Sequence, residues 1–161
     1  MDSINVQEAF SWIVGILEKH CIPFQIAGGL AAIHYGATRD LYDIDIDIPE
    51  DLFETIIPDV SSYIVFGPSH FKDTVWDIYL LTLCYNGQLI DIGGAHQAKV
   101  FNSKNGLWES LNVDFSHTEK SNIYGKIVPV ISKDELIKYK SILNRTVDQL
   151  DLLGLMEVKV S

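Results

Sequence analysis

The sequence has few basic residues for its length, and most of them lie in its last third. Twelve lysines and arginines stand against twenty-two aspartates and glutamates, which gives a formal net charge of −10. Residues 1–98 hold three basic and fourteen acidic side chains, whereas residues 99–161 hold nine and eight. A protein that binds a nucleic-acid backbone normally presents a basic face. We therefore expect no binding of a DNA or RNA backbone.

Cysteines and long apolar runs are also scarce. Cys21 and Cys84 form no Cys-x-x-Cys pair, which argues against a zinc site and for a reducing, cytoplasmic setting. No apolar stretch approaches the roughly eighteen residues that span a bilayer, so no membrane partner is expected. Hydrophobic residues make up 47% of the 161, enough to bury a core. We predict a single domain over residues 1–161, with a core at 23–93 and a C-terminal helical part at 127–158.

Two common phosphate-binding loops are missing. Gly28 and Gly29 join an apolar segment, residues 23–27, to a predicted helix at residues 30–35. No Gly-Lys-Ser/Thr follows, which excludes a Walker loop, and no third glycine lies in register for a dinucleotide-binding fingerprint. A glycine pair between a strand and a helix still lets a phosphate approach the backbone. Glycines also end many strands without binding anything.

The feature most typical of a catalytic site is a strand with one acidic face. In residues 42–48, Asp43, Asp45 and Asp47 alternate with apolar residues, and this period of two predicts a strand with its carboxylates on one face. Like charges this close cost energy unless a cation or water compensates them. Mg²⁺ and Mn²⁺ accept such oxygen ligands. An edge strand with a solvated acidic face is the alternative.

A calcium-binding EF-hand is a further alternative, because the three aspartates and Glu54 fall at positions 1, 3, 5 and 12 of such a loop. Position 6 would be Ile48, where the sharp turn requires glycine, and Pro49 follows it. Isoleucines between the aspartates favour a strand over a loop. We therefore disfavour calcium.

Several of these residues share the spacing of a known motif: Gly28-Gly29, Gly36, Arg39, Asp43 and Asp45. The pattern resembles that of the polymerase-β-type nucleotidyltransferase superfamily, in its Gly-Gly branch of antibiotic-modifying and toxin–antitoxin-associated members. The resemblance implies that Asp43 and Asp45 bind Mg²⁺ or Mn²⁺ and that Gly28, Gly29 and Arg39 bind a nucleotide. The chain departs from the superfamily's pattern at Leu41, where threonine is common. Asp47 is an extra carboxylate that the pattern does not contain.

The resemblance also implies a third catalytic and metal-binding carboxylate on a later strand. Asn86-Gly87 predicts a hairpin between residues 75–85 and 88–92. We assign the third carboxylate to Asp91, which interrupts an apolar strand where an unpaired charge would be costly. Asp77, on the other arm, is the rival, and a purely structural hydrogen-bonded aspartate is the alternative.

Near the C-terminus, Ser132 and Glu135 form a capping box that predicts a helix to about residue 143, followed by a second helix from residue 146. The segment resembles a Lys, Arg, Lys-Asp, Asp stretch of the Gly-Gly branch, which implies nucleotide contacts for Lys140 and Arg145. Val147 stands where that branch often has lysine. As solvated helix cations, both residues would instead be unremarkable.

Three weaker predictions concern the connecting segments. Residues 50–57 are predicted to form a short helix closed by Pro58, and residues 63–66 a strand stopped by Gly67-Pro68. Residues 95–124 show no clear pattern, except that asparagine, serine and glycine at 102–106 suggest a loop.

The order of elements predicts an α+β fold with a mixed or antiparallel sheet flanked by helices. The resemblance implies a metal-dependent nucleotidyltransferase that moves a nucleoside monophosphate from an NTP to a hydroxyl of a small molecule or a protein. The alternative is a nucleotide-binding or partner-binding module, such as a toxin–antitoxin component, because a fold can persist without its activity. A protein partner or a second copy of the chain would suit that alternative.

Overall fold

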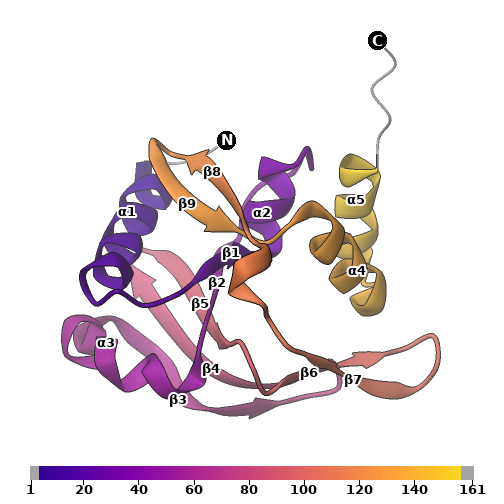
Figure 1. Ribbon diagram of the computed structural model, residues 1–161, viewed down its shortest axis with the longest axis horizontal. Coiled ribbons are helices and arrows are strands. Elements are labelled where there is room, and N and C mark those ends of the chain that lie inside the picture. Colours follow the sequence, from indigo (N-terminus) through magenta and orange to yellow (C-terminus); the bar gives the residue numbers. More distant parts are fainter. Residues whose placement is uncertain (1–3, 157–161) are drawn as a thin grey trace.

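The molecule is a layered arrangement of helices around one sheet, described for residues 4–156 in this computed structural model (Figure 1). The strands are β1 (Gln25–Ala27), β2 (Asp43–Ile48), β3 (Ile64–Lys72), β4 (Trp76–Tyr85), β5 (Gln88–Gly94), β6 (Ala98–Asn102), β7 (Leu107–Leu111), β8 (Glu119–Ile123) and β9 (Lys126–Val130). The α-helices are α1 (Ile4–Lys19), α2 (Gly28–His34), α3 (Phe53–Val60), α4 (Lys133–Leu143) and α5 (Thr146–Leu155). Short 3₁₀ turns are η1 (Glu50–Leu52), η2 (Ser61–Tyr63) and η3 (Phe115–His117).

The nine strands form a mixed sheet in the order β7-β6-β4-β5-β2-β1-β9-β8, and β3 pairs with β4 beside this path. The β1–β9 and β2–β5 pairs are parallel, and the other pairs are antiparallel. The predicted α+β class is thereby confirmed. The acidic strand β2 lies between β5 and β1, so it is neither an edge strand nor a calcium loop.

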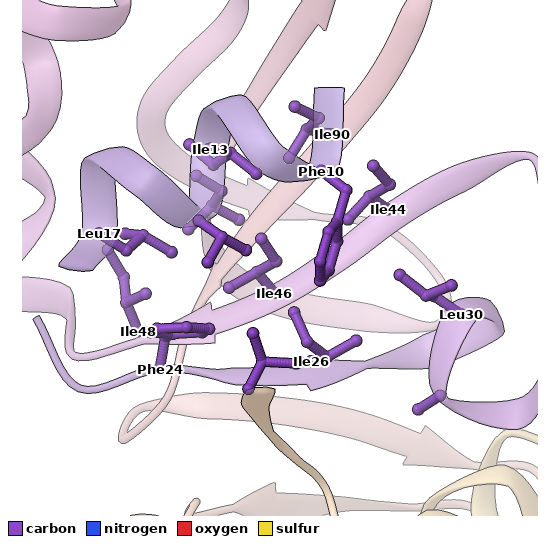
Figure 2. Packing of buried hydrophobic residues seen from close by; sticks show 14 of the residues in the cluster. Phe10, Ile13, Leu17, Phe24, Ile26, Leu30, Ile44, Ile46, Ile48 and Ile90 are labelled. Carbon is purple, nitrogen blue, oxygen red and sulfur yellow. The ribbon is translucent and has the colours of Figure 1, made fainter. Parts of the chain in front are cut away.

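The core lies under the apolar face of β2. Ile44, Ile46 and Ile48 are buried there, and the intervening aspartates point to the opposite face. Phe10, Ile13 and Leu17 of α1 pack onto these isoleucines, together with Ile26 of β1 and Ile90 of β5 (Figure 2). Each such buried side chain contributes roughly 1.5–3 kcal/mol. The core therefore fixes the register of β2 and the direction of its carboxylates.

The predicted ends of two elements are wrong. Pro58 does not close its helix but lies inside α3, because Phe53, Ile56 and Val60 bury the apolar face of α3 while Pro58 stays exposed. Gly67-Pro68 does not stop β3, which continues to Lys72 with a register shift between Phe66 and Ser69. Because β3 pairs only with β4, its proline costs no central ladder hydrogen bond.

Residues 95–124, where the sequence shows no clear pattern apart from the loop suggested at 102–106, contain β6, β7 and β8. These strands are short and have weak alternation, and β6 pairs with β7, the next strand in the chain. β6 also pairs with β4, and β8 pairs with β9. The polar stretch at 102–106 is the turn between β6 and β7, closed by the Gly106 amide donating to the Asn102 carbonyl at 2.8 Å.

The last two residues of the predicted C-terminal part, 157–158, lie outside the described residues. Within residues 4–156, none of the helices combines the length and the apolar character needed to cross a bilayer.

Glycine permits close packing between α5 and the segment after α2. A Cβ built at Gly154 would lie 2.7 Å from the Cα of Ala37 and 2.8 Å from the carbonyl oxygen of Gly36. Both contacts are with backbone, so a rotamer change cannot relieve them. By contrast, a Cβ at Gly15 in α1 would meet nothing within 4 Å.

We expect Gly154→Ala to lower the free energy of unfolding by roughly 1–3 kcal/mol, because α5 must move away from α2. Gly15→Ala is the matched control and should raise it by up to about 1 kcal/mol, since alanine has the higher helix propensity. Urea denaturation of both variants checks this. Equal stabilities would contradict the close packing.

Candidate active site

The site begins with a row of side chains across the sheet. In the register of the parallel pair, Asp45 on β2 stands beside Asp91 on β5. On the next strand, Thr82 stands opposite Asp91, and its hydroxyl donates to the Asp91 carboxylate at 2.7 Å. On the other side of Asp45 lies Ala27, the last residue of β1. Carboxylates distant in the chain are thus neighbours because their strands are paired.

Three carboxylates form what we call the acidic cluster: Asp43, Asp45 and Asp91. One oxygen from each lies within 4.8 Å of the others. Such a set of oxygens suits Mg²⁺ or Mn²⁺, which prefer oxygen ligands. The rival Asp77 instead contacts His70 and lies 3.9 Å from the Lys72 ammonium, outside the cluster.

Burial and mutual repulsion change the protonation of this face. Burial, followed by contact with Asp91, raises the pKa of Asp43 to about 6. Burial, followed by the charges of Asp43 and Asp91, raises the pKa of Asp45 well above its usual range. Burial also raises the pKa of Asp47 to about 6, against a 2.8 Å hydrogen bond from Gln25. Each shift measures the cost of holding an unneutralised negative charge here.

The two glycines have steric roles beside this cluster. Gly28 has a φ of +57°, and a Cβ there would lie 2.0 Å from the Asp45 carboxylate. A Cβ at Gly29 would lie 2.5 Å from the Arg39 guanidinium. Larger residues at either position would displace a charged group of the site, and Gly28 also needs the backbone freedom of glycine.

Opposite charges pair in what we call the charged network, which joins Arg39, from the segment between α2 and β2, to four residues of the C-terminal part: Lys140, Arg145, Asp148 and Asp151. Arg39 donates to Asp151 through two nitrogens, at 2.7 and 3.0 Å. The Lys140 ammonium lies 2.9 Å from Asp151 and 3.3 Å from Asp148. Arg145 donates to Asp148 at 2.6 and 3.0 Å and stacks 4.7 Å above the Trp76 ring.

The acidic cluster and the three cations of the charged network line one cavity of about 610 Å³. All the residues predicted for the site line it: Gly28, Gly29, Arg39, Asp43, Asp45, Asp91, Lys140 and Arg145. Lys140 borders the cavity, but its side chain is only 3% exposed because the ammonium is turned towards Asp148 and Asp151. It therefore acts on the cavity mainly through its charge.

The sequence did not indicate that Thr82 and Gln25 belong to the site, nor that Asp148 and Asp151 have a structural role in it. Thr82 and Gln25 are single polar residues in strands, so only the strand register shows that they contact Asp91 and Asp47. The spacing of Asp148 and Asp151 by three places them on one face of α5. That spacing was a usable signal of a shared partner, and the partner is Lys140.

The sheet and the helices have the fold of solved nucleotidyltransferases. A Thermotoga maritima protein assigned as a nucleotidyltransferase is similar, with a TM-score of 0.74 and 19% identity over 95% of this chain and 92% of its own. The lincosamide antibiotic adenylyltransferase LnuA, solved with lincomycin, gives 0.63 and 16% over 94% and 97%. ANT(2″)-Ia in complex with adenylyl-2″-tobramycin gives 0.61 and 15% over 92% and 86%.

No protein-family profile and no curated protein sequence matches the chain. At the identities above, the likeness to solved structures establishes the fold, and this is the fold that the resemblance of the motif implied. The chain spans most of the length of each of these three structures.

The raised pKa of Asp43 predicts a pH-dependent cost to stability in metal-free protein. Its folded value of about 6 exceeds the unfolded value of about 3.9. Protonation therefore favours the folded state; this stabilisation is full below about pH 3.9 and is lost as the pH rises through about 6. Asp43→Asn should gain stability relative to wild type across this window and hold the gain at higher pH.

Urea denaturation between pH 4 and 8 with a chelator measures this difference. Asp59→Asn serves as the control, because hydrogen bonds from His20 and then Lys19 lower the pKa of Asp59. Between pH 4 and 8 this variant should give a constant difference from wild type, since the wild type loses the Asp59 contribution only as the pH falls below about 3.9. A flat difference for Asp43→Asn would contradict the raised pKa.

Proposed function

We propose that this protein transfers a nucleoside monophosphate from an NTP to a hydroxyl group of a small molecule, with Mg²⁺ or Mn²⁺ as cofactor. The observation that carries the proposal is the acidic cluster, with its carboxylate oxygens within 4.8 Å of one another on one wall of a cavity. The charged network on the facing helices supports it, because a triphosphate needs positive charge nearby.

The acidic cluster fits a divalent metal, since it offers oxygen ligands only. Burial, followed by the interaction with neighbouring carboxylates, raises the pKa of Asp43 and Asp45, and a cation would offset that cost. When bound, such a cation neutralises the phosphate oxygens and favours in-line displacement. Asp43 and Asp45 would hold it. Asp91, oriented by Thr82, would complete the ligand set and take the proton of the acceptor hydroxyl. The hydroxyl oxygen bonds to the α-phosphorus, and the α–β phosphoanhydride bond breaks to release pyrophosphate.

The triphosphate would lie between the acidic cluster and the charged network. Arg39 and Arg145 are the cations with exposed side chains there, at 12% and 38%. Gly28 and Gly29 line the cavity, and their lack of a side chain leaves room for the Asp45 carboxylate and the Arg39 guanidinium beside them. Lys140 contributes charge from beneath this surface.

The acceptor would occupy the rest of the cavity. Beyond the acidic cluster, that wall is lined by apolar side chains of β3 and β4 and of the segment after β7, namely Phe71, Ile78, Leu80 and Val113. Asp73, Asp114 and Glu135 add negative charge. This lining suits a small acceptor that carries apolar groups and a positive charge. Two of the similar structures hold an antibiotic or its adenylyl derivative, which supports a small-molecule acceptor.

We predict that NTP binding requires metal, because the acidic cluster alone would repel a triphosphate. Calorimetry with each NTP should detect binding with Mg²⁺ or Mn²⁺ and at least tenfold weaker binding with a chelator. Equal affinity in both conditions would remove the metal site from the proposal.

A second experiment tests the catalytic role of Asp91. Asp91→Asn should lower pyrophosphate release by roughly 10²-fold or more, the range expected on losing a catalytic base. It should keep much of the metal-dependent NTP binding, since Asp43 and Asp45 remain. Asp77→Asn is the matched control on the neighbouring strand and should keep turnover. Asp43→Asn and Asp45→Asn should each abolish transfer, and Asp47→Asn should be milder.

Each variant is tested with labelled NTPs and a panel of amine-containing alcohols, and its folding is checked by thermal melting. Wild-type turnover in folded Asp91→Asn would refute its role. Metal-dependent NTP binding by the wild type without pyrophosphate release on any acceptor would favour the nucleotide-binding module instead.

A further inference from the structure

The charges of the network are paired with one another. Its two carboxylates, Asp148 and Asp151, are fully buried, with 0% of each side chain exposed. Buried charges persist only when they are paired and hydrogen-bonded. Both aspartates meet this condition through the three cations of the network. Three positive and two negative charges leave the network one positive charge in excess.

These cations lie near the acidic cluster but do not pair with it. Burial dominates the pKa of Asp43, but the charges of Arg39 and Arg145 act on it in the opposite direction. Lys140 acts in the same lowering direction on Asp45, again against the effect of burial. Among the described residues, the ion pairs of all three cations are with Asp148 and Asp151, and none is with the acidic cluster.

Long cationic side chains beside three close carboxylates would normally form ion pairs with them, because opposite charges attract most strongly in a partly buried site. Such a pair would occupy the oxygens that a metal needs. The geometry of Arg39 prevents this. Its guanidinium is bound through two nitrogens by Asp151 and rests against Gly29, where a Cβ would lie 2.5 Å away. Asp148 restrains Arg145 in the same two-nitrogen manner, with Trp76 beneath it.

We propose that Asp148 and Asp151 are positioning residues that hold the cations of the network off the acidic cluster and so keep the cluster open to a divalent metal. The same restraint orients the guanidinium groups of Arg39 and Arg145 towards the cavity. This inference rests on the proposed function, because it assumes that the acidic cluster binds metal.

The test is Mn²⁺ binding to the full chain without nucleotide, measured by electron paramagnetic resonance of free Mn²⁺. Asp151→Asn keeps the shape but removes the charge that restrains Arg39. The freed guanidinium should then pair with the acidic cluster and weaken Mn²⁺ binding by about 10–100-fold. This is the loss of affinity typical of mutating a residue that orients the ligands of a metal site. Removing that guanidinium as well, in Arg39→Gln/Asp151→Asn, should restore the Mn²⁺ affinity of Arg39→Gln alone.

The double variant separates positioning from simple stabilisation. Loss of structural support would lower the melting temperature, and deleting Arg39 would not bring back metal affinity. Asp59→Asn, which loses ion pairs with Lys19 and His20 away from the cavity, is the control and should bind Mn²⁺ like the wild type. If Asp151→Asn fails to fold, Asp148→Asn with and without Arg145→Gln provides the same comparison, since Lys140 keeps Asp151 as its partner.

The outcomes distinguish this inference from the proposed function. Absence of Mn²⁺ binding in the wild type overturns the metal-dependent function, and this inference with it. Wild-type binding that is unchanged in folded Asp151→Asn overturns only the inference. Weakened binding in Asp151→Asn that the added Arg39→Gln substitution does not restore also overturns only the inference. Weakened binding with recovery in the double variant supports it.

Discussion

Repulsion among the three carboxylates of the acidic cluster is the constraint around which this molecule is built. One oxygen from each lies within 4.8 Å of the others, and burial raises the pKa of Asp43 and Asp45. A flexible segment would turn these side chains apart. β2 cannot, because Ile44 and Ile46 between them are buried under α1 and a change of side-chain direction would bring both into solvent. Burial of the isoleucines on one face of β2 thus keeps the mutually repelling carboxylates together on the other face.

The C-terminal helices bring positive charge near these carboxylates without forming ion pairs with them. They bring Lys140 and Arg145 towards the cavity, and Arg39 joins them from the segment between α2 and β2. Had these cations paired directly with the carboxylates, the site would be stable and inert. Their pairing with Asp148 and Asp151 instead keeps two regions of opposite charge on facing walls of one cavity. A nucleotide with its metal carries charges complementary to both regions.

The parts of this arrangement that could be predicted are those encoded by local periodicity. The alternation in β2, the Asn86-Gly87 hairpin and the Ser132 cap each depend on a few consecutive residues, and the structure has all three. β6 and β8 were missed because they are short and alternate weakly, so local periodicity does not mark them. Thr82 was missed for another reason, since its hydrogen bond to Asp91 depends on the β4–β5 register.

Lys140 illustrates why a motif match identifies a residue more reliably than it identifies its contacts. The motif placed a lysine near the nucleotide, and the side chain does border the cavity. Its ammonium, however, lies 2.9 Å from Asp151 and 3.3 Å from Asp148, and it is almost fully buried. A lysine so placed cannot reach a phosphate without abandoning two buried carboxylates, which would be left unpaired at high cost. In the proposed function, Lys140 would therefore act on a nucleotide through the field of the network and through the two arginines that share its partners.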